Sequence, residues 1–176
     1  MVKQIKKKFF DVEIPSVGSE TQMQAHEISE LEGRFMKYDL TRMLKGKSII
    51  LTLKIHVKDS KATATPTKMV LMPYFLRRMV RKGTDYVEDS FAAECKDSVL
   101  RIKPFLITRK KVSRAIRKAL RNKAKEELIN YVKEKKTEEI FDEVIKNQMQ
   151  RPLSLKLKEI YPLALCEIRI LEAKQK

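Results

Sequence analysis

The sequence predicts an α+β fold in which antiparallel β-hairpins are flanked by basic amphipathic helices. Two stretches alternate apolar and polar residues and then reverse at a Lys-Asp-Ser turn, which is typical of hairpins. Two other stretches repeat apolar residues at helical spacing, opposite a row of Arg and Lys. Hydrophobic residues make up 43% of the 176 residues, which is enough to build a core.

The first hairpin is predicted from residues 49–57, where every second residue is Ile, Leu or Val. A turn over 58–61 and a returning strand over 62–72 complete it. Pro66 has no N–H to donate to a neighbouring strand, so we expect it at a sheet edge or a β-bulge.

The second hairpin turns at 96–98 and returns over 99–108, where Pro104 again predicts an edge or a bulge. Four residues before the turn share its apolar face: Val87, Phe91, Ala93 and Cys95. A last strand is expected over 164–171, with an apolar row of Ala164, Cys166, Ile168 and Ile170.

Four helices are expected between these strands. Pro73 fits the first position of a helix over 74–82, which Gly83 ends. A longer helix begins near Lys111, and we expect it to kink, break or meet a new neighbour near Glu126, because its later apolar residues leave the first stripe. That first stripe consists of Val112, Ala115, Ile116, Ala119 and Leu120. A third helix is expected over 137–149, and a short one ends at Tyr161.

Residues 15–33 are polar and show no sustained period, so they predict an extended or irregular arm that becomes ordered against a partner. A flexible linker is the alternative interpretation of the same composition.

The charge is strongly positive and unevenly distributed. The chain carries 39 Lys and Arg against 23 Asp and Glu, a net charge of +16. Residues 60–84 and 98–125 contain no acidic residue, whereas 126–143 are rich in acids. This segregation predicts one surface that binds phosphates and another that faces water or a protein.

The candidate phosphate ligands come from the basic N-terminus, the basic helices and the segment before the longer helix. They are Lys6, Lys7, Lys8, Arg77, Arg78, Arg81, Lys82, Arg109, Lys110, Lys111, Arg114, Arg117, Lys118, Arg121 and Lys125. Aromatic residues total only 7% and there is no Trp, so we expect recognition of folded RNA through phosphates and shape rather than base stacking.

No constellation of catalytic or metal-binding residues is apparent. Two Cys and two His, without partners at ligand spacing, predict neither a disulfide framework nor a metal site. No phosphate-cradling or dinucleotide motif is present, so we expect no cofactor and no enzyme activity. No apolar run is long enough to span a membrane, and the start lacks a secretory signal, so we expect a cytoplasmic protein.

Several motifs, in order along the chain, resemble those of one family. The opening KKKFFDVEIP, residues 6–15, is similar to the start of the S3Ae family of small-subunit ribosomal proteins from archaea and eukaryotes. Further blocks resemble that family at Gly33-Arg34, Asp39-Leu40-Thr41, residues 74–84, residues 96–103, residues 114–118, residues 160–163 and Glu167-Ile168-Arg169.

The resemblance implies a structural protein of the ribosome, on the platform of the small subunit near the mRNA exit. It implies contacts with small-subunit rRNA, including the region of its 3′ end, with neighbouring ribosomal proteins of the platform, and with mRNA near the exit channel as a further option. It also implies an antiparallel, barrel-like sheet with an extended N-terminal arm. We therefore expect a basic arm and irregular segment over 1–33 and a single rRNA-binding α+β domain over 34–176.

Two other function classes stay open. A free RNA-binding or translation-regulating protein of the same fold would bind RNA without residing in the subunit at one copy each. A nucleic-acid enzyme would need clustered carboxylates or a metal, and metal-dependent cleavage of RNA would identify it.

Overall fold

The computed structural model describes residues 6–59 and 61–174. Along the chain the elements are β1 (Lys8–Ile14), β2 (Ser19–Ala25), the 3-10 helix η1 (Ile28–Leu31), β3 (Phe35–Asp39), β4 (Ile49–Lys58), β5 (Lys61–Leu71), α1 (Pro73–Met79), β6 (Tyr86–Glu88), β7 (Phe91–Glu94), β8 (Val99–Thr108), α2 (Arg114–Lys133), α3 (Thr137–Ile145), α4 (Gln150–Lys158) and β9 (Leu163–Lys174). The α+β class is confirmed.

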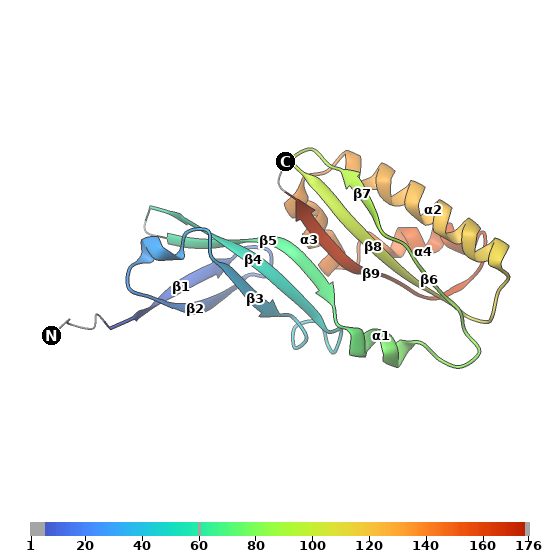
Figure 1. Ribbon diagram of the computed structural model, residues 1–176, viewed down its shortest axis with the longest axis horizontal. Helices are drawn as coiled ribbons and strands as arrows, with labels where there is room; N and C mark the ends of the chain where they lie inside the picture. The colour runs from blue at the N-terminus through green and yellow to red at the C-terminus, as the bar shows by residue number, and fades with distance from the viewer. Residues whose placement is uncertain (1–5, 60, 175–176) are drawn as a thin grey trace.

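Strand β5 connects the two halves of the molecule (Figure 1). One of its edges pairs with β4 over the length of the predicted first hairpin. The other edge pairs in parallel with β1 at Ala62 and Thr63, and in antiparallel with β9 over 68–70. The result is one mixed, mostly antiparallel sheet that continues from the N-terminal strands into β9, β8, β6 and β7.

The N-terminal strands follow the order β2-β1-β5-β4-β3. Alternate residues of β4 from Ile49 to Ile55 are completely buried, as the predicted alternation requires. The two outer strands approach each other, since the Ser19 hydroxyl lies 3.2 Å from the Tyr38 hydroxyl. Within the residues that the structure describes, however, no backbone ladder joins β2 to β3, so the expected barrel-like closure is not confirmed.

The segment predicted to be irregular contains regular structure. Ser19–Ala25 forms β2, which pairs with β1 along its whole length. Only Ala25 of this strand is buried, which explains why its sequence shows no apolar period. Leu31 of η1 is also fully buried and anchors the segment to the core. Residues 19–25 are therefore extended but belong to the sheet, so the expectation of an irregular arm or a flexible linker was wrong for them, whereas the domain boundary at residue 33 stays a prediction.

Both prolines of the predicted strands lie beside β-bulges. In the β4–β5 ladder, Leu53 pairs with Pro66 while Thr52 pairs with Lys68, so Thr67 is the extra residue. In the β8–β9 ladder, Pro104 pairs with Ile168 while Lys103 pairs with Ile170, so Arg169 is the extra residue. The missing proline N–H is accommodated where the register shifts, as predicted.

The bulge at Arg169 also changes which residues of β9 are buried. Cys166 and Ile168 lie in the core, as expected, but the next buried residue is Leu171 rather than Ile170. Ala164, the first member of the predicted row, is exposed.

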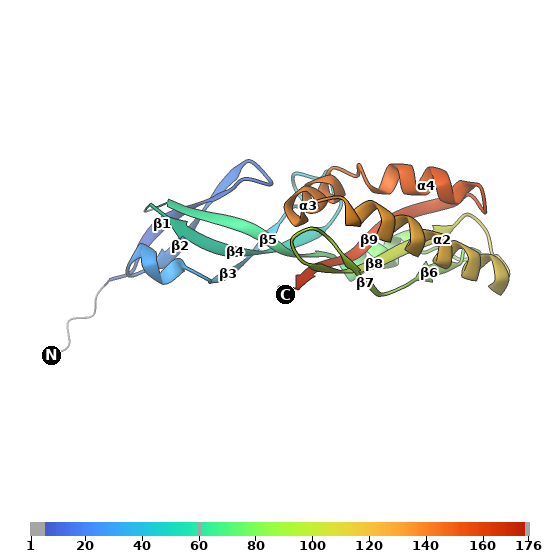
Figure 2. The same cartoon turned by 90° about the horizontal axis from the view of Figure 1, so that it is seen from above.

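Helices α2, α3 and α4 gather over the strands of the C-terminal half (Figure 2). Helix α2 is continuous past Glu126, and its buried residues are Leu120, Ala124, Leu128 and Val132. Residues four apart on a helix are rotated by about 40° around its axis, so these buried residues form a line that winds around α2. This line follows the contacts of α2 with β7 and α4. The predicted apolar stripe was wrong at Ala115 and Ala119, which are exposed. The new neighbour that was expected for the second half of this helix is α4.

Candidate nucleic-acid interface

The first half of α2 carries a continuous basic stripe. Arg114, Lys118, Arg121 and Lys125 are all exposed and, together with Arg117, fall within about 100° of arc around the helix. The stripe ends at Lys125, whose ammonium lies 5.9 Å from the centre of the Phe91 ring on β7. This spacing allows several side chains to reach one phosphate backbone at once.

The stripe faces a groove between α2 and β6. Tyr86, Val87, Arg114, Arg117, Lys118 and Arg121 line it, and its volume is about 320 Å³. Among the described residues, the Nε of Arg117 is buried and has no hydrogen-bond partner. A buried donor without a partner is costly, so this guanidinium is suited to bind an anion that enters the groove.

The charge at the start of α2 is opposite to what helix stability favours. The N-terminus of a helix carries partial positive charge, so acidic residues are stabilising there and basic ones are not. The first turn of α2 contains Arg114 and Arg117 and no acidic residue. The Ser113 hydroxyl caps the helix by accepting a hydrogen bond from the Ile116 N–H at 3.4 Å. An anion bound at this end would remove the electrostatic penalty.

The exposed loop that carries Arg109, Lys110 and Lys111 is fixed by hydrogen bonds from the segment before β6. The Asp85 carboxylate accepts a hydrogen bond from the Val112 N–H at 2.9 Å, and the Thr108 N–H donates to the Asp85 carbonyl oxygen at 2.9 Å. The buried Thr108 hydroxyl accepts from the Asp85 N–H at 3.1 Å and lies 2.7 Å from the Lys110 carbonyl oxygen. These contacts hold the three basic side chains beside the start of α2.

Helix α1 and the residues just after it carry the second group of predicted ligands; the helix ends at Met79, earlier than the expected Lys82. Its inner face buries Phe75 and Leu76, as its sequence predicts, while Val80 of the expected stripe lies beyond the helix end and is partly exposed. The predicted ligands of this segment are exposed and are Arg77, Arg78, Arg81 and Lys82. Arg78 also lies over the Phe75 ring, 5.6 Å from its centre.

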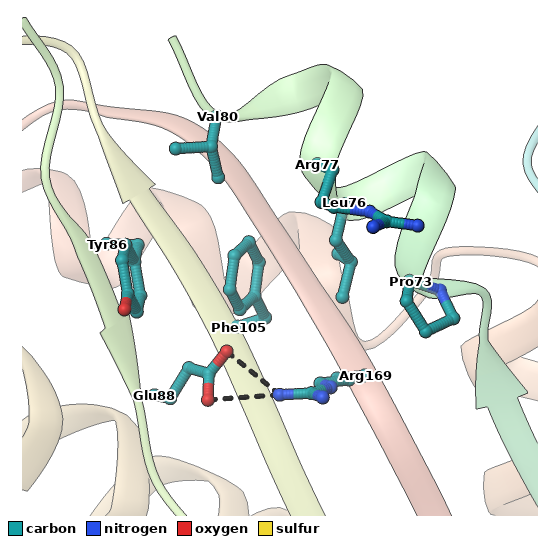
Figure 3. A pocket seen from close by; sticks show the side chains of 8 residues that line it. All are labelled: Pro73, Leu76, Arg77, Val80, Tyr86, Glu88, Phe105 and Arg169. Carbon is teal, nitrogen blue, oxygen red and sulfur yellow. Dashed lines mark hydrogen bonds and ion pairs between the residues drawn. The ribbon is translucent and has the colours of Figure 1, made fainter. Parts of the chain in front are cut away.

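An apolar groove of about 390 Å³ separates α1 from β6 (Figure 3). Its lining residues are Pro73, Leu76, Arg77, Val80, Tyr86, Glu88, Phe105 and Arg169. Tyr86 lines both this groove and the basic groove beside α2. The structure therefore brings the basic groups of α1 and α2 to the two sides of one short strand, β6.

Lys6, Lys7 and Lys8 are not part of this surface. They are exposed and precede or begin β1, at the opposite end of the molecule from α2 (Figure 1). If they bind RNA, they contact a different portion of it.

Two acidic residues of the segment after the stripe, Glu127 and Glu143, pair with lysines of the same chain. Glu127 accepts a hydrogen bond from Lys156 of α4 at 2.5 Å, which holds the pKa of the Glu127 carboxyl below its usual range. Glu143 accepts from the Tyr131 hydroxyl at 2.8 Å and pairs with Lys135. These acids therefore help to join α2, α3 and α4, and they leave the first half of α2 uncompensated.

In the part of the chain that the structure describes, no group of three or more His, Cys, Asp or Glu could hold a metal ion. His56 lies 3.3 Å from the Glu32 carboxylate, and Cys95 and Cys166 are both buried. No helix in residues 6–59 or 61–174 is long and apolar enough to cross a membrane.

Several aromatic side chains are exposed, which the sequence did not predict. Phe9 is 63% exposed, Phe35 62% and Tyr86 55%. Tyr86 lies in a strand of three residues, which is too short to show an alternating pattern. Its position next to Arg114 and Arg117 depends on the packing of α2 and is not visible in the sequence.

Comparison with known proteins identifies the family. The model of the Ribosomal S3Ae family matches residues 3–175. The small ribosomal subunit protein eS1 of Nanoarchaeum equitans is 24% identical over 93% of this chain and 87% of its own length. The protein of the same name from Pyrobaculum aerophilum is 29% identical over 92% of this chain and 77% of its own length. Because the family model spans nearly the whole sequence, the chain belongs to the Ribosomal S3Ae family.

Proposed function

We propose that this protein is a structural component of the small ribosomal subunit and binds rRNA through the basic surface on both sides of β6. Membership of a ribosomal protein family supports the structural role. The main support for the RNA contact is the basic stripe from Arg114 to Lys125, which has no acidic residue to neutralise it. Within this stripe, the buried Nε of Arg117 has no hydrogen-bond partner. Such a surface suits a phosphate backbone, which binds mainly through Arg and Lys.

We further propose a division of roles among the predicted ligands. The five basic residues of α2 bind one stretch of backbone, and the loop with Arg109, Lys110 and Lys111 binds the phosphates next to the helix N-terminus. The basic residues of α1 bind the continuation of the same RNA beyond β6. Lys6, Lys7 and Lys8 bind a separate portion of rRNA. In keeping with the family resemblance, we place the protein and its rRNA contacts on the platform of the small subunit, near the mRNA exit and the rRNA 3′ end.

Charge reversal tests the proposal. The triple variant Arg114→Glu, Arg117→Glu, Arg121→Glu is expected to stay folded by circular dichroism, since Arg114 and Arg121 are exposed and Arg117 lies at the groove. We expect it to be absent from small subunits purified from cells that express it. A matched variant reverses three exposed lysines outside this surface, Lys37, Lys58 and Lys61, and is expected to be incorporated. Normal incorporation of the α2 variant would contradict the proposal.

A further inference from the structure

We propose that the apolar groove between α1 and β6 receives one unpaired RNA base, whose neighbouring phosphates are bound by the basic residues of α1 and α2. This inference rests on the proposed rRNA contact. It adds that one nucleotide of the bound rRNA is unpaired, because a base inside a duplex could not enter the groove.

The shape of the groove suits a flat apolar ring. Tyr86 lines one side of the groove, Phe105 lies in its middle, and Leu76 of α1 lines the opposite side, while Val80, just after α1, lies at one end (Figure 3). The Tyr86 and Phe105 rings lie with centroids 5.8 Å apart and planes inclined by 21°. Tyr86 is therefore held by Phe105 while more than half of its surface stays exposed. Aromatic side chains supported in this way provide stacking surfaces for unpaired bases.

The charges around the groove favour a nucleotide over an apolar protein side chain. Arg77 lines the groove on the α1 side, and beyond Tyr86 lies the second groove with Arg114, Arg117, Lys118 and Arg121. A ligand that extends over Tyr86 therefore contacts the apolar groove on one side of this ring and the basic groove beside α2 on the other. A nucleotide has a flat base and an adjoining anion, and so complements both parts.

The polar end of the groove can contact the edge of a base. The Nη1 of Arg169 donates to both Glu88 carboxylate oxygens, at 3.0 and 3.1 Å (Figure 3). Arg169 is the extra residue of a bulge in β9 and, unlike the buried Ile168 before it, is partly exposed and lines the groove. Arginine donors and carboxylate acceptors are the groups that bind base edges.

Photocrosslinking in assembled subunits tests the occupant directly. Val80 lines the groove, and it is replaced by p-benzoylphenylalanine in the full-length chain. Asn122, exposed next to the basic stripe of α2, is replaced in a second chain. After irradiation of purified small subunits, we expect both chains to form RNA adducts, and the Val80 adduct to map to a nucleotide that is unpaired in the subunit.

The outcomes separate this inference from the proposed function. A protein adduct at Val80, or no adduct there while Asn122 crosslinks to RNA, would overturn the base-binding groove and leave the rRNA contact intact. Absence of RNA adducts from both positions would overturn both.

A binding measurement provides a second test. The probe is purified small-subunit rRNA, and the variants of the full chain are Tyr86→Ala and Tyr86→Phe. Loss of the ring is expected to weaken binding about tenfold, whereas Tyr86→Phe stays within about twofold, because the stacking surface is retained. Tyr74→Ala removes an exposed tyrosine of α1 that does not line the groove, and is expected to bind as the unaltered chain does. Equal affinity of Tyr86→Ala and the unaltered chain would overturn the inference.

Discussion

The Asp85 carboxylate accepts a hydrogen bond from the Val112 N–H at 2.9 Å, so an acidic residue positions the most basic segment of the chain. Asp85 lies between α1 and β6, and Val112 lies between the Arg109–Lys111 loop and α2. A substitution of Asp85 can therefore change the position of this loop without changing its three basic side chains.

Asp85→Ala is expected to weaken binding to small-subunit rRNA several-fold. The substitution raises the net charge, which by itself would strengthen binding to a polyanion. It also releases the Val112 N–H, so the three basic side chains of the loop lose their fixed position. Asp97→Ala, in the exposed turn between β7 and β8, removes the same charge away from the loop and serves as the control. Tighter binding by Asp85→Ala would show that charge alone decides the affinity.

Arg114→Glu is expected to have opposite effects on stability and binding. A carboxylate in the first turn of α2 interacts favourably with the helix N-terminus, so the isolated chain should gain about 0.5 kcal/mol in free energy of unfolding. Affinity for rRNA should fall by at least tenfold, since one attractive charge becomes repulsive. The free energy is measured by urea titration with circular dichroism, because the chain contains no Trp. A loss of stability would indicate that Arg114 has a structural role.

Lys47→Met is expected to destabilise the fold by about 3 kcal/mol, because it leaves the largely buried Glu167 carboxylate without its lysine partner. The Lys47 ammonium lies 2.7 Å from the Glu167 carboxylate, and the two side chains are only 12% and 13% exposed. The pair joins the turn before β4 to β9, so it links the two halves of the molecule. The change is measured as the shift in the urea midpoint.

Lys68→Met is the matched control for this pair. Lys68 and Glu172 also pair between strands, at 3.0 Å, but their side chains are 39% and 30% exposed. Water screens this pair, so the cost should stay below about 1 kcal/mol. Equal costs for the two variants would contradict the assignment of Lys47 as a buried link.

The buried Cys166 thiol predicts a specific loss of stability at high pH. Burial raises the pKa of this thiol from 9.0 to about 12. Above pH 9 the thiol of the unfolded chain loses its proton while that of the folded chain keeps it, so the unfolded state is favoured. The stability contributed by the neutral thiol is thus complete below pH 9 and is lost as the pH rises toward 12.

The comparison with Cys166→Ala isolates this effect from the titration of the many lysines. As the pH rises above 9, the stability advantage of the unaltered chain over Cys166→Ala should shrink, with a slope that approaches about 1.4 kcal/mol per pH unit above about pH 10. A difference that stays constant with pH would contradict a buried, protonated Cys166.

The sequence was sufficient where the pattern was local. Alternation from Ile49 to Val57 predicted β4, and the missing N–H of Pro66 and Pro104 predicted an edge or a bulge, of which the structure has the bulge, because each depends on the chain within a few residues. The acid-free run from Ser98 to Lys125 likewise identified the basic stripe of α2.

What the sequence could not provide depends on contacts between distant segments. Strand β2 is formed by pairing with β1 and buries only Ala25, so its own residues show no period. The buried face of α2 passes through Leu120 and Val132 because the helix crosses its neighbours obliquely, which a fixed helical stripe does not anticipate. Tyr86 acquires its place between two grooves only when α1 and α2 pack on either side of β6.

The proposed function requires this chain to reside in the small ribosomal subunit, held there by many phosphate contacts. The most direct measurement is sedimentation of native small subunits through gradients of low and then high monovalent salt, with quantification of this chain per subunit. We predict one copy per subunit, retained through a moderate salt wash. Sub-stoichiometric protein that is released at the first rise in salt would contradict this and indicate an RNA-binding factor that visits the subunit.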